Sequence, residues 1–149
     1  MAILIGIDGG DHTGFAVWET EAQEFLQIAT LPLHRALEEV NRWKYACDMA
    51  PRLTPLRVVV EDPRQRTWFR PERSNSEYRG RLMGAGAAKR DAKIWEEFLQ
   101  DKGILYEMRK PKAGATKWDA KFWEQVIGYK GRTSEHSRDA ALLVYGQKY

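Results

Sequence analysis

The chain contains very little cysteine: Cys47 is the only one among its 149 residues. An intrachain disulfide is therefore impossible, and there is no CxxC pair to hold a structural zinc ion. Long hydrophobic runs are also lacking. Gly6 and Asp8 interrupt the first apolar run, which is too short for the core of a signal peptide or for a membrane span. We therefore expect a soluble, cytoplasmic protein with no membrane partner.

Repeats, low-complexity tracts and flexible linkers are absent as well, so nothing in the sequence divides the chain. Its 43% apolar and 30% charged residues are typical of an ordinary globular protein. A length of 149 residues is enough for one domain with its own hydrophobic core. We expect a single domain that spans residues 1–149.

Positive charge is concentrated in two segments, although the net charge is only +3. Residues 64–93 contain nine basic and three acidic side chains, and residues 109–121 contain five and one. The two segments together carry +10, which leaves the rest of the chain at −7. Such clustering is typical of proteins that bind a phosphate backbone, although an isolated basic segment is more often a solvated face. The candidate DNA contacts are Arg64, Arg66, Trp68, Phe69, Arg70, Arg73, Arg79, Arg81, Lys89, Arg90, Lys110, Lys112, Lys117 and Lys121.

Hydrophobic periodicity and turn residues predict five strands and four helices. The polar residues 62–78, which include Pro63 and Pro71, are predicted to form a long loop of the kind often kept for function. The expected strands cover residues 2–8, 14–19, 25–31, 56–61 and 104–108, and the expected helices lie between Pro32 and Pro51, at 81–101, at 117–127, and from Thr133 or Ser134 to Val144.

The order of these elements predicts an α/β fold. The first three strands form an antiparallel meander, and a helix before and after the fourth strand makes the remaining strands parallel. The result is a mixed five-stranded sheet flanked by helices. The first and fourth strands are almost entirely apolar, which favours adjacent central positions that are covered on both faces.

An acidic residue ends each of these two apolar strands: Asp8 ends the first and Glu61 the fourth. A carboxylate beside a buried strand costs free energy unless it is paired or binds a cation. If the two strands lie side by side, both acids come within reach of one ion, and carboxylate oxygens are the ligands that hard divalent cations prefer. Asp62 follows directly but is expected to point to the opposite face.

The last predicted helix carries two further polar candidates, His136 and Asp139, at positions i and i+3. This spacing puts both on one face, which Ala140, Leu143 and Val144 continue down the helix. The face that packs on the sheet therefore begins with an imidazole and a carboxylate. Alternatively, both are ordinary residues of a helix N-terminus, where a carboxylate interacts favourably with the helix dipole.

Three patterns occur in order: GID ending at Asp8, VVVE ending at Glu61, and HxxDA beginning with His136 and containing Asp139. Together they resemble RuvC-type Holliday-junction resolvases of the RNase H-like superfamily, phage-encoded or otherwise divergent members in particular. The resemblance spans essentially the whole chain, because the order of elements fits as well. It implies an RNase H-like nuclease domain, a homodimer, and two Mg²⁺ ions per site, with Mn²⁺ as a substitute. The implied partner is branched DNA, and four-way junctions are the expected substrate.

The same resemblance assigns residue roles. It leaves open whether His136 is a metal ligand or the acceptor of a proton from the attacking water. Members of the family carry a stacking aromatic residue soon after the second acid, whereas here arginines come first and Trp68 and Phe69 follow. The implied catalytic residues are Asp8, Glu61, His136 and Asp139, all four as metal ligands, and Lys117, with Lys121 as its alternative.

Other functions compete with junction resolution. The same fold and metals could cut flaps, forks or RNA–DNA hybrids. A non-catalytic module that binds branched DNA is a third hypothesis, although a pure binder has no reason to keep acids that face phosphates. A sugar-kinase-like ATP site also begins with a Gly-Asp-Gly hairpin, but 149 residues leave no room for its second lobe.

Overall fold

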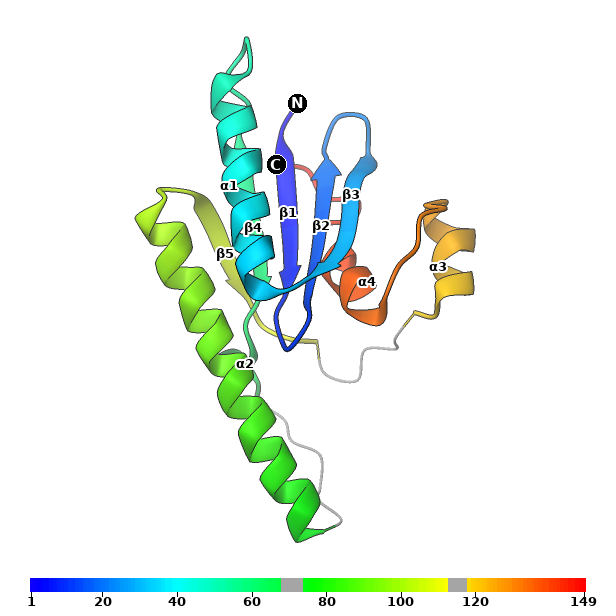
Figure 1. The fold of residues 1–149 in the computed structure, drawn as a ribbon. Coiled ribbons are helices and arrows are strands. Elements are labelled where there is room, and N and C mark those ends of the chain that lie inside the picture. Colours follow the sequence, from blue (N-terminus) through cyan, green and yellow to red (C-terminus); the bar gives the residue numbers. More distant parts are fainter. Residues whose placement is uncertain (68–73, 113–117) are drawn as a thin grey trace.

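The computed structural model describes residues 1–67, 74–112 and 118–149 (Figure 1). Its elements are β1 (Ile3–Asp8), β2 (Thr13–Glu19), β3 (Glu24–Leu31), α1 (Leu33–Met49), β4 (Leu56–Glu61), the short 3₁₀ helix η1 (Pro63–Gln65), α2 (Asn75–Asp101), β5 (Leu105–Arg109), α3 (Ala120–Ile127) and α4 (Glu135–Leu142). The strands form one sheet in the order β3-β2-β1-β4-β5. β1 is antiparallel to β2, as β2 is to β3, and β1, β4 and β5 are parallel. This α/β arrangement is an RNase H-like topology, and it confirms the predicted mixed sheet.

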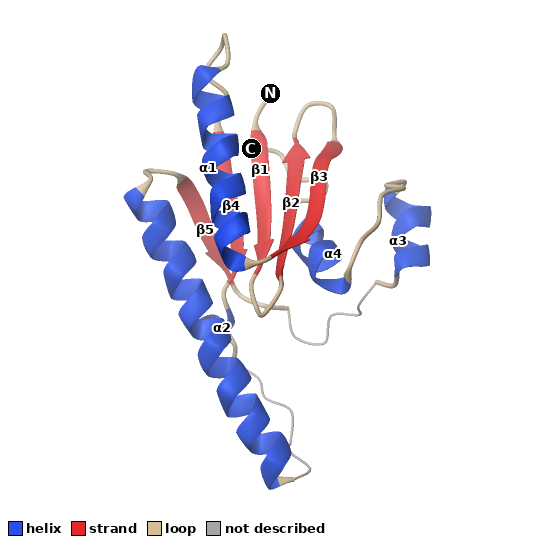
Figure 2. Ribbon diagram, in the orientation of Figure 1, coloured by secondary structure: helices blue, strands red, loops and turns tan. Residues whose placement is uncertain are grey.

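Helices cover both faces of the sheet (Figure 2). On one face, Val40 of α1 and Trp95 and Leu99 of α2 pack in one core cluster with the odd-numbered side chains of β1. On the other face, Ala140 of α4 packs with Ala16 of β2. β1 and β4 are therefore buried from both sides, which explains why their sequences are almost entirely apolar.

Two glycines allow α4 to lie directly against the sheet. A Cβ atom on Gly14 would collide with the backbone carbonyl of His136, and one on Gly6 would collide with the backbone carbonyl of Ala140. Any larger residue at either position would push the helix away, because the obstacle is backbone and not a flexible side chain. The position of α4, and of the polar side chains at its start, therefore depends on these two glycines.

α2 is 27 residues long, but its buried residues, Ala92, Trp95 and Leu99, all lie toward its C-terminal end. Residues 75–88, which we call the arm, project beyond the sheet (Figure 1). Leu82 and Met83 on the arm are 55% and 78% exposed. An apolar stripe was predicted for this helix, and only its C-terminal part belongs to the hydrophobic core.

The prediction of a continuous loop over residues 62–78 was wrong, because α2 begins at Asn75 and not at residue 81. The side chain of Ser74 accepts a hydrogen bond from the backbone N–H of Glu77 at 3.1 Å. This contact satisfies one of the unpaired donors at the start of the helix. The spacing Ser74-x-x-Glu77 is a helix-start pattern, so the sequence contained the information that would have placed this boundary.

α3 begins later than predicted, at Ala120 instead of residue 117. The Asp119 side chain accepts a hydrogen bond from the backbone N–H of Phe122 at 2.8 Å and caps the helix there. β5 covers residues 105–109, one residue later than the predicted 104–108. These shifts change no neighbour relation within the sheet.

α4 begins as predicted, with Ser134 as its N-cap. The Ser137 backbone N–H donates to the Ser134 hydroxyl at 3.1 Å, and the Ser134 N–H donates to the Ser137 hydroxyl at 2.8 Å. The helix ends at Leu142 and not at Val144. The reason is a tightened last turn, in which the Val144 N–H donates to the carbonyl of Ala141.

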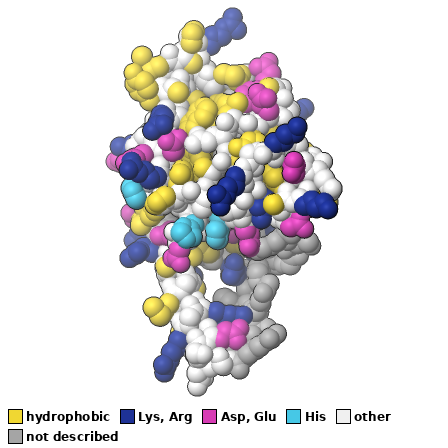
Figure 3. Space-filling view, turned by 45° about the vertical axis from the view of Figure 1, so that its right-hand side comes forward, with side chains coloured by type: hydrophobic (Ala, Val, Ile, Leu, Met, Phe, Trp, Pro, Cys, Tyr) yellow, Lys and Arg dark blue, Asp and Glu magenta, His cyan; other side chains and the backbone are white. Residues whose placement is uncertain are grey.

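The surface of the molecule is charged with both signs. On the face seen in Figure 3, Lys and Arg side chains are interspersed with Asp and Glu. No helix within residues 1–67, 74–112 and 118–149 is long and apolar enough to cross a membrane.

Candidate active site

A pocket of about 220 Å³ lies where β1 and β4 end. Four of its lining residues are Asp8, Glu61, His136 and Asp139. These are the four residues that the sequence put forward as metal ligands. They come from three separate elements and meet at one edge of the sheet.

Strand pairing brings the two strand acids together. β1 and β4 are parallel, and Ile7 pairs with Val60. Asp8 and Glu61 are the next residues on each strand, so they leave the sheet side by side and on the same face. β4 ends at Glu61, and Asp62 does not line the pocket: its side chain accepts a hydrogen bond from Nε of Arg64 at 2.8 Å.

α4 supplies the other half of the polar set. Nδ1 of His136 lies 3.3 Å from Oδ2 of Asp8, close enough for a hydrogen bond or, with a protonated ring, an ion pair. The Asp8 side chain is only 14% exposed, whereas that of His136 is 45% exposed. The imidazole therefore lies between a nearly buried carboxylate and solvent.

Burial and crowding of negative charge raise the pKa of Asp8 from 3.8 to about 7. Burial is the largest cause, followed by repulsion from Glu61; repulsion from Asp139 adds to it, and the contact with His136 opposes it. Without a compensating cation, this carboxylate is therefore only partly ionised near neutral pH. Carboxyl groups with such raised pKa values are typical of functional sites.

We expect the metal-free protein to lose stability as the pH rises from about 4 to about 7. The folded state holds the Asp8 proton over this range and the unfolded chain does not, so stability falls with pH. Above pH 7 Asp8 is ionised in both the folded and the unfolded state, so the loss of stability is complete. Asp8→Asn should then melt above the wild type by at least about 2 °C, from a gain of more than about 1 kcal/mol.

Thermal melts with a chelator at pH 5 and pH 8 measure this effect. Asp62→Asn is the control, because its effect should have the opposite sign. Burial alone would raise the pKa of Asp62, but hydrogen bonds from Arg64 and Gln65 outweigh it and hold the pKa below 3.8. An Asp8→Asn protein that melts below the wild type at pH 8 would contradict the proposed crowding of charge.

The donor set of the pocket fits a hard divalent cation. Three carboxylates and one imidazole supply oxygen and nitrogen ligands of the kind that Mg²⁺ and Mn²⁺ accept. Among the described residues, no three His, Cys, Asp or Glu side chains already converge into a metal cage. Binding would therefore require the side chains to rotate toward the ion. Burial, followed by the negative charge of Glu61, raises the pKa of Asp8, and a bound cation would favour the ionised form against both effects.

The rest of the pocket is formed by two walls. One wall comes from the segment after β4, through Pro63 and Arg66, and the other from α2, through Ala88, Ala92 and Trp95. Of the described residues that line the pocket, Arg66 alone carries a permanently positive charge.

Arg64 was predicted to contact DNA, but in the structure its side chain is paired with two carboxylates. Its guanidinium pairs with Asp62 at 2.8 Å and with Glu96 of α2 at 2.9 Å. The hydrogen bond to Asp62, and then that to Glu96, raise the pKa of Arg64 further above its usual range. Two carboxylates therefore neutralise this charge, and we no longer expect Arg64 to contribute to DNA affinity.

The other predicted DNA contacts lie on several elements or outside the described residues. Lys89 and Arg90 directly follow the arm and are exposed, as are Lys110, Lys112 and Lys121 beyond β5. Arg79 and Arg81 lie on the arm itself, where Arg81 pairs with Glu77 at 3.5 Å. Outside the described residues are Trp68, Phe69, Arg70, Arg73 and Lys117.

Sequence reasoning missed two parts of this site: Glu96, and the apolar wall from Ala88 to Trp95. The wall was recognised as an apolar stripe, but nothing in the sequence shows that the stripe borders the acids. Glu96 is one of many acids on a helix surface, and only the fold brings it to Arg64. The spacing Asp62-x-Arg64 was the single available indication of an ion pair.

In comparisons with protein-family models and with curated protein sequences, nothing matches this chain.

Proposed function

We propose that this chain is a metal-dependent endonuclease that acts on branched DNA, with four-way (Holliday) junctions as its first substrate. The observation that carries the proposal is the pocket in which three carboxylates and one histidine meet beside the ends of β1 and β4. A protein that only bound DNA would lose affinity from acids that face phosphates. The resemblance of the ordered motifs to RuvC-type resolvases supports this choice of substrate.

Asp8, Glu61, Asp139 and His136 are the residues that would hold two Mg²⁺ ions, or Mn²⁺ in their place. When bound, the ions supply charge neutralisation at the phosphate and an activated water for hydrolysis. Asp8 is the ligand best suited to be shared, since it lies on the central strand and feels the charges of the other three. His136 reaches solvent, so it can complete the metal shell or accept a proton from water. Arg66 would orient the phosphate.

The exposed basic residues would hold the DNA backbone, so binding should weaken steeply with salt. Each neutralised phosphate contributes about −0.9 to the slope of log affinity against log salt concentration. We expect Lys89→Ala with Arg90→Ala to reduce the steepness of that slope by up to about 1.8. Fluorescence anisotropy with a labelled junction over a range of salt concentrations measures it.

The matched control replaces two exposed basic residues of α1, Arg35 and Arg42, which pair with acids of their own helix. This double variant should keep the wild-type slope. Equal slopes for the Lys89–Arg90 variant and the wild type would remove this pair from the DNA interface.

The proposal includes a homodimer. A four-way junction is resolved by two matched nicks, and one pocket per chain can make only one of them. A twofold pair of protomers matches the twofold symmetry of the substrate, and cyclic dimers are the commonest closed assembly. The exposed Leu82 and Met83 of the arm are candidate contacts between protomers.

Cleavage of a panel of labelled substrates tests the proposal. The panel contains four-way junctions, flaps, forks, linear duplexes and RNA–DNA hybrids, each with Mg²⁺ and with a chelator. We expect the four-way junction to be the preferred substrate and to be cut by paired nicks that require the metal. Light scattering on the same samples should report a dimer. A monomer that prefers flaps or forks would indicate the second nuclease function, and tight binding without any cleavage would indicate a non-catalytic module.

A further inference from the structure

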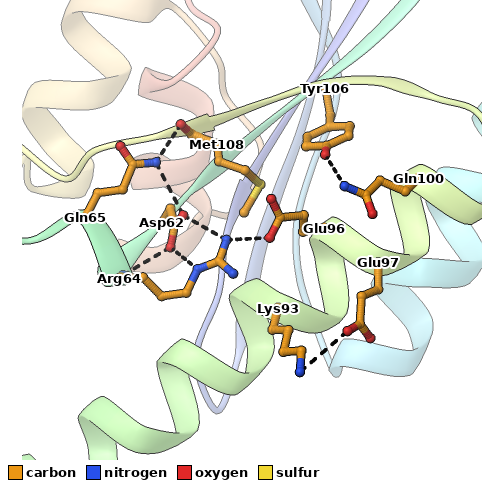
Figure 4. A network of polar contacts seen from close by, with 9 residues as sticks. All are labelled: Asp62, Arg64, Gln65, Lys93, Glu96, Glu97, Gln100, Tyr106 and Met108. Atoms are coloured by element: carbon orange, nitrogen blue, oxygen red, sulfur yellow. Dashed lines mark hydrogen bonds and ion pairs between the residues drawn. The ribbon is translucent and has the colours of Figure 1, made fainter.

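In the segment after β4, the Arg64 guanidinium joins two carboxylates that belong to different elements (Figure 4). Its Nε and one terminal nitrogen donate to the two oxygens of Asp62 at 2.8 and 2.9 Å. A terminal nitrogen also lies 2.9 Å from Oε2 of Glu96 on α2. The Asp62 side chain is nearly buried, with 4% exposed, whereas the side chains of Arg64 and Glu96 are 31% and 32% exposed, so the network runs from the interior to the surface. We call Asp62, Arg64 and Glu96 the clamp.

Side-chain and backbone contacts around Asp62 extend the clamp to β5. Gln65 donates from its side-chain amide to the backbone carbonyl of Met108 at 2.8 Å and to Asp62 at 3.3 Å (Figure 4). The backbone N–H of Asp62 donates to the carbonyl of Arg109 at 2.8 Å. The segment after β4 is therefore held at three points: within itself, on β5 and on α2.

The clamp connects the two walls of the candidate active site. Arg64 lies in the chain between Pro63 and Arg66, the pocket residues of the first wall. Glu96 directly follows Trp95, a pocket residue of the α2 wall. The ion pair between Arg64 and Glu96 therefore links the two walls.

A role in holding DNA does not explain these contacts. Two carboxylates around one guanidinium give the clamp a net charge of −1, which repels a phosphate. An arginine fork suits this geometry, because it can donate to both carboxylates at once, whereas a lysine ammonium cannot reproduce the bidentate contact.

We propose that Asp62, Arg64 and Glu96 are positioning residues that set the width of the pocket and thereby orient Glu61 and Arg66 for the reaction. This inference rests on the proposed nuclease function. Misplacement of reacting groups by about 1 Å can reduce turnover by about a hundredfold. Loosening the clamp should therefore lower kcat, while affinity for DNA, which the exposed basic residues provide, stays nearly unchanged.

The test is a double-mutant cycle with Arg64→Lys, Glu96→Gln and the combined variant. Each single variant should lower kcat by about tenfold or more and change KM by less than about twofold. The combined variant should be no slower than the slower single variant, because either change alone breaks the bridge. Glu97→Gln is the matched control: the same charge is removed one residue away, from an exposed pair with Lys93, and kcat should not change.

A second measurement does not depend on cleavage. Hydrogen exchange of the Arg64–Arg66 backbone amides should become faster in Glu96→Gln and stay unchanged in Glu97→Gln, since only the former releases the segment from α2. If the wild type cuts no substrate, the proposed function fails, and faster exchange still supports the clamp. Unchanged exchange, wild-type kcat in Glu96→Gln, or a loss of DNA affinity confined to Arg64→Lys would each overturn the inference.

Discussion

Replacing Asp8 with asparagine is expected to lower junction cleavage by about a thousandfold or more, which corresponds to about 4 kcal/mol of activation free energy. The substitution keeps the size of the side chain but removes the charge that Glu61 and His136 surround. The fold should survive, because the change also removes repulsion within the pocket. Single-turnover cleavage assays with Mg²⁺ measure the loss.

DNA binding separates this effect from general damage. Affinity for the junction should stay equal or rise, because one negative charge that faces the phosphates is gone. Asp11→Asn, in the exposed hairpin turn, is the control and should cut like the wild type. We expect Glu61→Gln and Asp139→Asn to behave like Asp8→Asn. Normal cleavage by any one of them would exclude that residue from the site.

His136→Ala should cause a large loss of cleavage, which Mn²⁺ partly restores if the imidazole serves as a metal ligand. The alternative role, accepting a proton from water, predicts a changed dependence of cleavage on pH that Mn²⁺ does not restore. Measuring cleavage with each metal across a range of pH separates the two roles.

Replacing Gly14 with alanine is expected to lower the unfolding free energy by about 3 kcal/mol and Tm by about 10 °C. The added methyl group would meet the backbone carbonyl of His136, which cannot rotate away as a side chain can. α4 must therefore shift, and His136 and Asp139 shift with it. Cleavage should fall by about a hundredfold even at temperatures where the variant is folded.

Thermal melts and cleavage assays on the same preparations test this expectation. Gly84→Ala on the arm is the matched control, because a Cβ there meets nothing within 4 Å. It should leave Tm unchanged or raise it slightly, since alanine favours a helix over glycine and the arm contributes no buried residue to the core. A Gly14→Ala protein with wild-type stability would show that α4 does not depend on this close contact.

The arrangement of the sheet could be predicted because its causes are local. Apolar strands, a glycine turn and the helices between strands determine which strands are neighbours, and this placed Asp8 beside Glu61. The N-cap of α4 could be predicted for the same reason, since Ser134 acts on residues of its own first turn. Once the buried face of α4 was known, the positions of His136 and Asp139 could be predicted as well.

The rest depended on contacts between distant residues. Nothing in the local sequence distinguishes Gly6 and Gly14 from glycines of an ordinary hairpin, and only the packed helix shows what they make room for. Arg64 resembled a DNA contact because its neighbours are basic, yet the fold brings Glu96 to it. A basic residue in a basic segment can be neutralised by partners far along the chain.

The arm gives α2 a gradient of stability along its length. Its C-terminal part is anchored by Ala92, Trp95 and Leu99 in the core, whereas the arm has no buried residue. Gly80, Gly84 and Gly86 lower its helix propensity further, each by about 1 kcal/mol relative to alanine. We therefore expect local unfolding of α2 to begin at Asn75 and to stop near Ala92, which would leave the sheet and the pocket acids intact. One continuous helix would then behave as two cooperative units, of which only one belongs to the folding core.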